Sequence, residues 1–148
     1  MTEFNITVDI AAAPARVWQV IADIERWHEW TPSVSSIRRL DAGPLAVGSR
    51  ARVRQPSLPP AVWEVTELHD GRSFTWVTRS PGVRVTARHA VEPGELGARA
   101  RLAVEFSGLL GPLVGRITRD LNERYLALEA NGLRRRSTSG PAASPSGP

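Results

Sequence analysis

Alternating apolar and polar positions dominate this chain, beginning at its N-terminus. Residues 4–10 place an apolar side chain at every second position, which predicts a half-buried β-strand. The following segment, "ARVWQVIADIERW", instead repeats its apolar positions at intervals of three and four, which predicts a short amphipathic helix. Pro14 suits the first turn of that helix, and Pro32 prevents its simple continuation beyond about residue 30.

From residue 34 the period returns to two and persists as far as residue 107. Turn signals such as "HDGR", "SPG" and "EPGELG" interrupt the alternation. Between these signals the pattern predicts six more strands, at residues 34–40, 49–55, 62–68, 73–79, 83–91 and 98–107.

A helical period closes the patterned part of the chain. Leu113, Ile117, Leu121, Tyr125 and Leu128 recur every three or four positions, which predicts one long helix over residues 112–135. The arginines at its C-terminal end suit the helix dipole.

The length of 148 residues suits one domain. Residues 137–148, "STSGPAASPSGP", have too little apolar surface to offset the entropy of ordering, so we predict a folded domain over residues 1–136 and a disordered Ser/Pro/Gly tail. The order of elements predicts an α+β fold in which an antiparallel meander is covered on one face by the long helix. A curved sheet around a straight helix leaves space between them, where a ligand can bind.

The alternation also assigns each strand residue to one face of the sheet. The apolar face must meet the long helix, because the chain has no other means of forming a core. Among the side chains then predicted to point inward are Gln55, Trp63, Trp76 and His89. Glu67 falls on the same face by parity, whereas the arginines at 50, 52, 54, 84, 88, 99 and 101 fall on the opposite face.

His89 is the only histidine predicted to point inward, and three roles are open for it. It can be a structural core residue bonded to a buried Tyr, Glu or carbonyl group. It can be a polar anchor for a ligand, or a general acid and base. Tyr125 on the long helix is a candidate partner from across the cavity.

The segment "ERWHEWTPSV" contains Trp27 and Trp30 where the first helix ends. Their spacing of three puts both on one side of a last helical turn. We expect Trp30 to pack inward against the long helix and the end of the cavity, with Trp27 covering the corner. His28 and Glu29 are expected to face solvent.

Charge and composition narrow the function classes. All basic residues are arginines and the net charge is +4, too small to indicate nucleic acid by itself. The predicted outer arginines have glutamates nearby and no aromatic residues between them for base stacking, so nucleic-acid binding is not expected. With no cysteine, no signal peptide and no apolar run long enough to span a membrane, a cytoplasmic protein is expected.

Motifs for metal or nucleophilic chemistry are not found. His28, His69 and His89 lie on different predicted elements, and no His/Asp/Glu pair has ligand spacing on one helix. The Gly-rich stretches lack the Lys and hydroxyl of a phosphate loop, and no serine lies in a nucleophile elbow. We expect no metal and no cofactor.

Three blocks carry a resemblance to a known family: "PARVWQVIADIERWHEWTPSV", "GPLAVGSRARVRQP" and "WEVTEL…SFTWVTRSPGVRVTARHAVEP". Over about residues 3–135 the chain resembles the polyketide cyclase/dehydrase group of the START-like (SRPBCC) superfamily. The resemblance implies a helix-grip fold, with about seven curved antiparallel strands around a long C-terminal helix and one or two short helices after the first strand. It implies no catalytic motif, since the superfamily spans aromatases, cyclases, lipid carriers and receptors.

Two functions follow from pattern and resemblance together. The first is binding of a small hydrophobic ligand, such as a lipid, polyketide or aromatic metabolite, by a monomer or homodimer. The second is a cyclase, aromatase or dehydratase that uses His89 as acid and base. Contact with a membrane is a weaker alternative that lipid-carrying relatives leave open. The residues expected to contact the ligand are Trp30, Val53, Gln55, Trp63, Trp76, Val85, His89, Leu102, Ile117, Leu121 and Tyr125.

Overall fold

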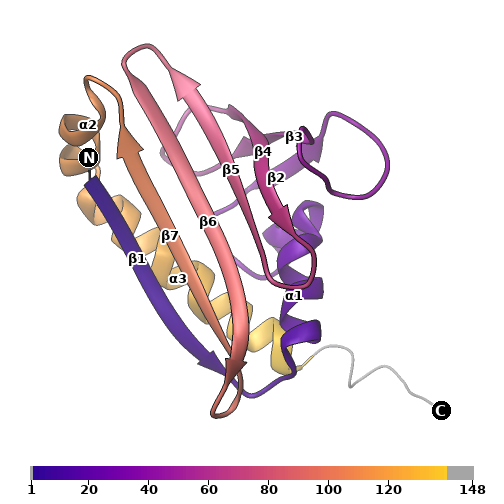
Figure 1. The fold of residues 1–148 in the computed structure, drawn as a ribbon. Coiled ribbons are helices and arrows are strands. Elements are labelled where there is room, and N and C mark those ends of the chain that lie inside the picture. Colours follow the sequence, from indigo (N-terminus) through magenta and orange to yellow (C-terminus); the bar gives the residue numbers. More distant parts are fainter. Residues whose placement is uncertain (1, 140–148) are drawn as a thin grey trace.

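The computed structural model describes residues 2–139 and shows an α+β fold (Figure 1). Seven strands form one antiparallel sheet in the order β1-β7-β6-β5-β4-β3-β2. The predicted fold class is confirmed. The strands are β1 (Thr2–Ile10), β2 (Ser36–Arg39), β3 (Arg50–Arg54), β4 (Ala61–His69), β5 (Ser73–Ser80), β6 (Val83–Gly94) and β7 (Gly97–Ser107).

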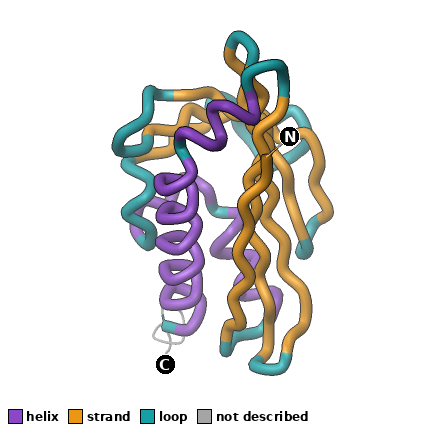
Figure 2. The backbone as a smooth tube through the Cα atoms, turned by 90° about the vertical axis from the view of Figure 1, so that its left-hand side faces the viewer, coloured by secondary structure: helices purple, strands orange, loops and turns teal. Residues whose placement is uncertain are grey.

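The helical segments all lie on one side of this sheet (Figure 2). Between β1 and β2 the chain forms α1 (Pro14–Ala22) and the 3₁₀ helix η1 (Ile24–Glu29). After β7 it forms α2 (Gly111–Ile117) and the long helix α3 (Arg119–Thr138). Because β1 pairs with β7, the first and last strands meet, and α1 and η1 lead the chain to the opposite edge of the sheet.

Two apolar clusters hold the helices on the sheet. The larger one packs α1, η1 and Trp30 against residues from all seven strands. It includes Ile10, Ile21, Phe74 and Leu133, each at most 1% exposed. The smaller one lies between β1, β7 and α3 and includes Phe4 and Leu126.

Gly132 of α3 packs very closely on the backbone of Trp30. A Cβ atom on this residue would lie 1.9 Å from the carbonyl oxygen of Trp30. Backbone therefore packs directly on backbone at this point, which only glycine permits. Close by, Arg136 of α3 donates to the carboxylate of Glu29 at 2.6 Å, so the C-terminal part of α3 is fastened to the end of η1.

The predicted helix over residues 112–135 is in fact two helices, and this prediction was wrong. The chain leaves helical geometry at Thr118, between α2 and α3. At the break, the Thr118 hydroxyl donates to the Val114 carbonyl at 2.7 Å and accepts from the side-chain amide of Asn122 at 2.9 Å. The change of direction leaves Leu113 and Ile117 on α2 exposed, so the apolar stripe does not continue inward.

Two further differences from the sequence pattern are local. A β-bulge between Val65 and Glu67 shifts the register of β4, so that Glu67 is exposed and Leu68 packs on the core instead. At the C-terminus, α3 continues through Thr138, two residues past the predicted domain boundary. The rest of the predicted tail, residues 140–148, lies outside the described residues.

The contact between α3 and Trp30 gives a direct prediction. Gly132→Ala places a methyl group against a backbone carbonyl that cannot move without displacing η1, so we expect a loss of roughly 2–3 kcal/mol in the free energy of unfolding. Urea denaturation measures it, with Asn131→Ala on the exposed side of the same turn as control. Equal stability of the two variants would show that the helix is not held at this contact.

Candidate ligand cavity

A cavity of about 360 Å³ lies between the sheet and α3. Strands β3 to β7 form one wall, α2 and α3 the other, and the loop after β3 contributes Gln55, Leu58 and Pro59. Most of the lining is apolar. The hydroxyl of Tyr125 donates to the carbonyl of Pro56, which ties this loop to α3 across the cavity.

Tryptophans and a histidine form one end of the cavity. The rings of Trp63 and Trp76 lie 5.5 Å apart, and Trp27 packs 5.6 Å from Trp76. His89 stacks on Phe74, with centroids 4.5 Å apart and planes at 20°. Alternation in β4, β5 and β6 turns these strand residues to the same face, and η1 brings Trp27 to them.

Trp30 packs inward against the long helix as expected, but Trp27 and not Trp30 lines the cavity. Both residues are buried and their rings lie 5.7 Å apart. The Trp27 indole lines the cavity and donates to the carbonyl of Ile21 at 3.0 Å. Trp30 follows the last residue of η1, outside helical geometry, and packs behind Trp27 against Gly132 of α3.

His89 lines the cavity and is only 5% exposed. Its Nδ1 atom is buried and has no hydrogen-bond partner among the described residues. Burial lowers the pKa of His89 to about 4, with a smaller opposing effect from the Phe74 backbone, so the ring is neutral at physiological pH. Tyr125, the expected partner, bonds to Pro56 instead.

Glu129 on α3 also lines the cavity, and sequence reasoning missed it. Ser33 donates to its carboxylate at 3.2 Å. Burial raises the pKa of Glu129 to about 7, and the bond from Ser33 opposes that rise. The sequence could have indicated Glu129 by its position four residues after Tyr125, because this spacing places both residues on one side of the helix.

The structure places most of the residues that were predicted to contact a ligand in the cavity wall. All of them except Trp30 and Ile117 line the cavity. Ile117 is 73% exposed because α2 packs on Phe106 of β7 through Gly111 and Gly115, which leaves Ile117 on the outer side of the helix.

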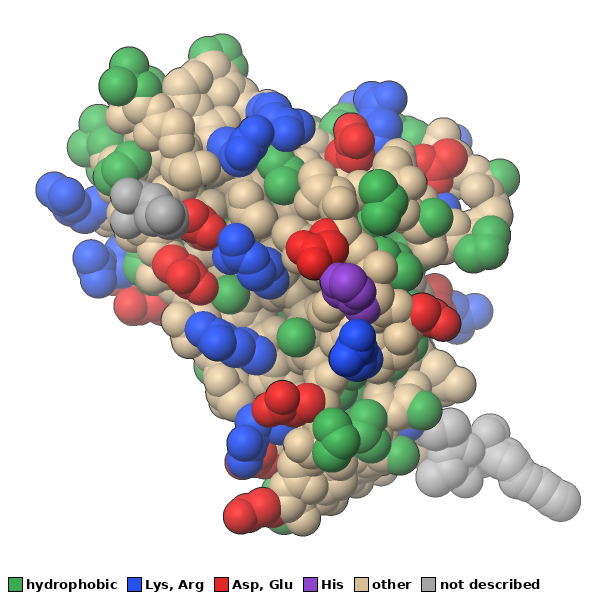
Figure 3. Space-filling view, viewed as in Figure 1, with side chains coloured by type: hydrophobic (Ala, Val, Ile, Leu, Met, Phe, Trp, Pro, Cys, Tyr) green, Lys and Arg blue, Asp and Glu red, His purple; other side chains and the backbone are tan. Residues whose placement is uncertain are grey.

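Charged groups other than Glu129 lie away from the cavity. No arginine is part of its lining. On the outer face of the sheet, basic and acidic side chains are interspersed, as Figure 3 shows. Arg88 pairs with Glu105 and Arg99 with Asp9, each at 3.0 Å.

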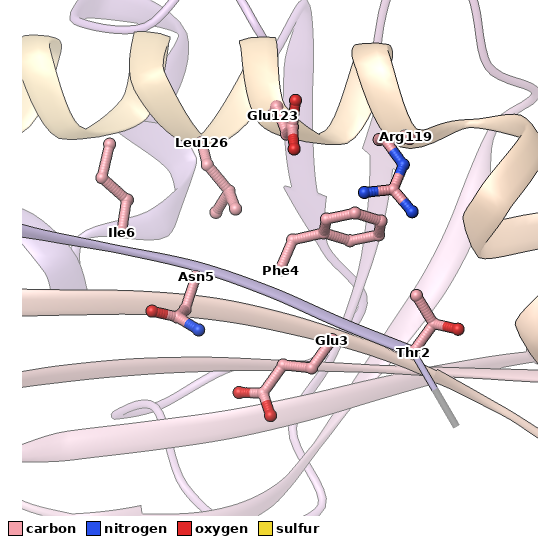
Figure 4. Close-up of a pocket in the computed structure, with 8 residues that line it drawn as sticks. All are labelled: Thr2, Glu3, Phe4, Asn5, Ile6, Arg119, Glu123 and Leu126. Carbon is pink, nitrogen blue, oxygen red and sulfur yellow. The ribbon is translucent and has the colours of Figure 1, made fainter.

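A second hollow, of about 420 Å³, lies between β1 and the N-terminal half of α3 (Figure 4). Arg119 lies over the ring of Phe4, 5.7 Å from its centroid. Leu126 lines both this hollow and the cavity. Apart from Leu126 and Phe4, its lining is mostly polar or charged, and no residue predicted to contact a ligand belongs to it.

Two searches of the described residues gave negative results. In residues 2–139 no group of three or more His, Asp or Glu side chains is placed to hold a metal ion. No helix in this part of the chain has the length and apolar character needed to cross a membrane.

Comparison with known proteins identifies the family. Residues 1–138 match the model of the family described as polyketide cyclase / dehydrase and lipid transport. The chain belongs to this family. No curated protein matches it in sequence.

Solved structures share the fold at low sequence identity. A structure from Thermobifida fusca has a TM-score of 0.76 at 20% identity, covering 93% of each chain. A START superfamily protein from Mycobacterium smegmatis has a TM-score of 0.70 at 16% identity, covering 92% of this chain and 99% of that one. The di-domain ARO/CYC BexL of the BE-7585A biosynthetic pathway has a TM-score of 0.73 at 15% identity, and the match covers 94% of this chain and 48% of BexL.

His89 and Glu129 make opposite contributions to the pH dependence of stability. Between its ordinary pKa of 4.5 and about 7, folded Glu129 keeps a proton that the unfolded chain releases, so stability falls as pH rises. Between about 4 and 6.5, unfolded His89 binds a proton that the folded protein does not, so stability rises with pH. The two effects oppose each other where these ranges overlap.

Glu129→Gln separates the two contributions. We expect the stability of this variant relative to the native protein to increase by roughly 2 kcal/mol between about pH 5 and about pH 8. Urea unfolding at both pH values measures the change. Glu123→Gln, on the exposed side of α3, is the matched control for loss of one negative charge. A relative stability of Glu129→Gln that does not vary with pH contradicts the raised pKa.

Proposed function

We propose that this protein binds a small hydrophobic molecule, such as a lipid, polyketide or aromatic metabolite, between its sheet and α3. The observation that carries the proposal is the cavity itself, whose volume of about 360 Å³ falls within the usual range for small-molecule sites, roughly 300–1,000 Å³. Membership of a family described by polyketide chemistry and lipid transport supports the same class of ligand.

The lining favours a ligand that contains a ring. Trp27, Trp63 and Trp76 form a continuous aromatic wall at one end, with centroid separations of 5.5 and 5.6 Å between neighbours. Such a wall offers a flat ligand stacked and edge-to-face contacts. Farther along, valine, leucine and alanine side chains from β6 and β7 complete the apolar surface.

A second candidate function is acid–base catalysis on the bound molecule. One observation favours it: the pKa of Glu129, about 7, lies near the value at which a general acid or base works best at neutral pH. His89, the residue first considered for this role, has a pKa of about 4 and is less suited to it. Liquid chromatography with mass spectrometry separates the two functions, because a binding protein releases its ligand unchanged and an enzyme releases a product of different mass or, for an isomer, different retention time.

Tryptophan fluorescence tests the binding function. N-phenyl-1-naphthylamine, an uncharged fluorescent molecule, should quench the cavity tryptophans in a saturable way as it accepts their excitation energy. Ala87→Phe fills the cavity from β6 and should weaken binding at least roughly tenfold, which is about 1.4 kcal/mol.

Ala90→Phe is the matched control, since Ala90 lies on the same strand and faces away from the cavity. Circular dichroism and thermal unfolding establish that both variants fold. Equal binding by Ala87→Phe and Ala90→Phe, or quenching that does not saturate, would mean that the dye does not occupy the cavity.

A further inference from the structure

Most polar side chains in the cavity already bond to the protein. Gln55 donates to the carbonyl of Ser33 at 3.2 Å, and Tyr125 donates to Pro56. Asn122 donates to the hydroxyl of Thr118 at 2.9 Å. These groups complete the structure around the cavity, so they have few remaining sites for a ligand.

His89 differs from them. It lines the cavity and is more than nine-tenths buried. Its Nδ1 atom is fully buried without a partner among the described residues, so Nε2 is the ring nitrogen that a ligand in the cavity can reach. A neutral imidazole has one donor and one acceptor, so at least one hydrogen-bonding position of the ring is free. A ligand hydroxyl that bonds to Nε2 adds one hydrogen bond at a mostly buried site, and such a bond stabilises the complex.

Glu129 is another polar group with unused capacity. A carboxyl group has about four acceptor sites when ionised, and the protein supplies one bond, from Ser33. Among the described residues of the lining, Glu129 is also the only carboxyl group, and no arginine is present to receive an anion. Above about pH 7, where Glu129 is ionised, a ligand carboxylate or phosphate inside the cavity would therefore meet a like charge and no cation.

We infer that the ligand is an uncharged, ring-containing alcohol or phenol, whose hydroxyl group hydrogen-bonds to the imidazole of His89. A hydroxyl is suited to this position because it donates and accepts, and so matches either tautomer of the ring. Glu129 excludes anionic analogues. This inference rests on the proposed function and narrows it to one chemical class.

Competition against bound N-phenyl-1-naphthylamine tests the inference with four probes of one shape. These are naphthalene, 2-naphthol, 2-naphthoate and the cation of 2-(aminomethyl)naphthalene. We expect 2-naphthol to bind roughly tenfold more tightly than naphthalene, the effect of one hydrogen bond to a buried group. We expect 2-naphthoate to bind most weakly.

Two variants assign these preferences to residues. His89→Phe keeps a ring that can stack on Phe74 and should make naphthalene and 2-naphthol bind equally. Thr78→Val is the matched control, because Thr78 lines the cavity four residues along β5 from Phe74, and it should keep the preference for 2-naphthol. Glu129→Gln should bind 2-naphthoate more tightly than the native protein does.

The outcomes test this inference separately from the proposed binding of a hydrophobic molecule. If the dye does not bind, the proposed function is wrong. If the dye binds but naphthalene and 2-naphthol compete equally, or if His89→Phe keeps the preference, the hydroxyl inference is wrong and the binding function stands. Tightest binding by the ammonium probe would assign the site to amines paired with Glu129, which also overturns it.

Discussion

The rest of this structure depends on the contact between the backbone of α3 at Gly132 and the carbonyl of Trp30. It brings the C-terminal half of the long helix directly onto the end of η1, with the Arg136–Glu29 pair beside it. Since α3 is fixed at this end, the sheet can curve away from the helix farther along. The cavity occupies the space that this divergence leaves, and Trp27 closes it next to the contact.

This constraint also explains the composition of the cavity wall. The strands supply inward residues by simple alternation, so their contribution is continuous and mostly apolar. The helical corner supplies Trp27, whose indole group is held by the carbonyl of Ile21. Together they surround His89 with aromatic rings, and this apolar surrounding lowers its pKa.

Much of the fold was predictable from the sequence, because apolar residues alternate with polar ones along a strand that has one side on the core. It gave the correct face for Trp63, Trp76 and His89. It failed at Glu67, because an extra residue in β4 reverses the parity. The helix break at Thr118 was not predictable, because Leu113, Ile117 and Leu121 keep a helical period whether or not the helix continues.

The candidate site was predictable on its apolar side and not on its polar side. Glu129 resembles an exposed helical glutamate in the sequence, and its partner Ser33 is 96 positions away. Only the packing of α3 on η1 brings them together. Trp27 and Trp30 could not be separated because the sequence does not show that the last turn is a 3₁₀ helix, which ends before Trp30.

The central claim is that the space between the sheet and α3 holds a small hydrophobic ligand. Nuclear Overhauser effects between bound N-phenyl-1-naphthylamine and the isotope-labelled protein test it most directly. The account predicts contacts from the dye to the indoles of Trp27, Trp63 and Trp76. Contacts confined to the exposed leucines at positions 109, 110 and 113 would place the dye on the outside of α2 and contradict the claim.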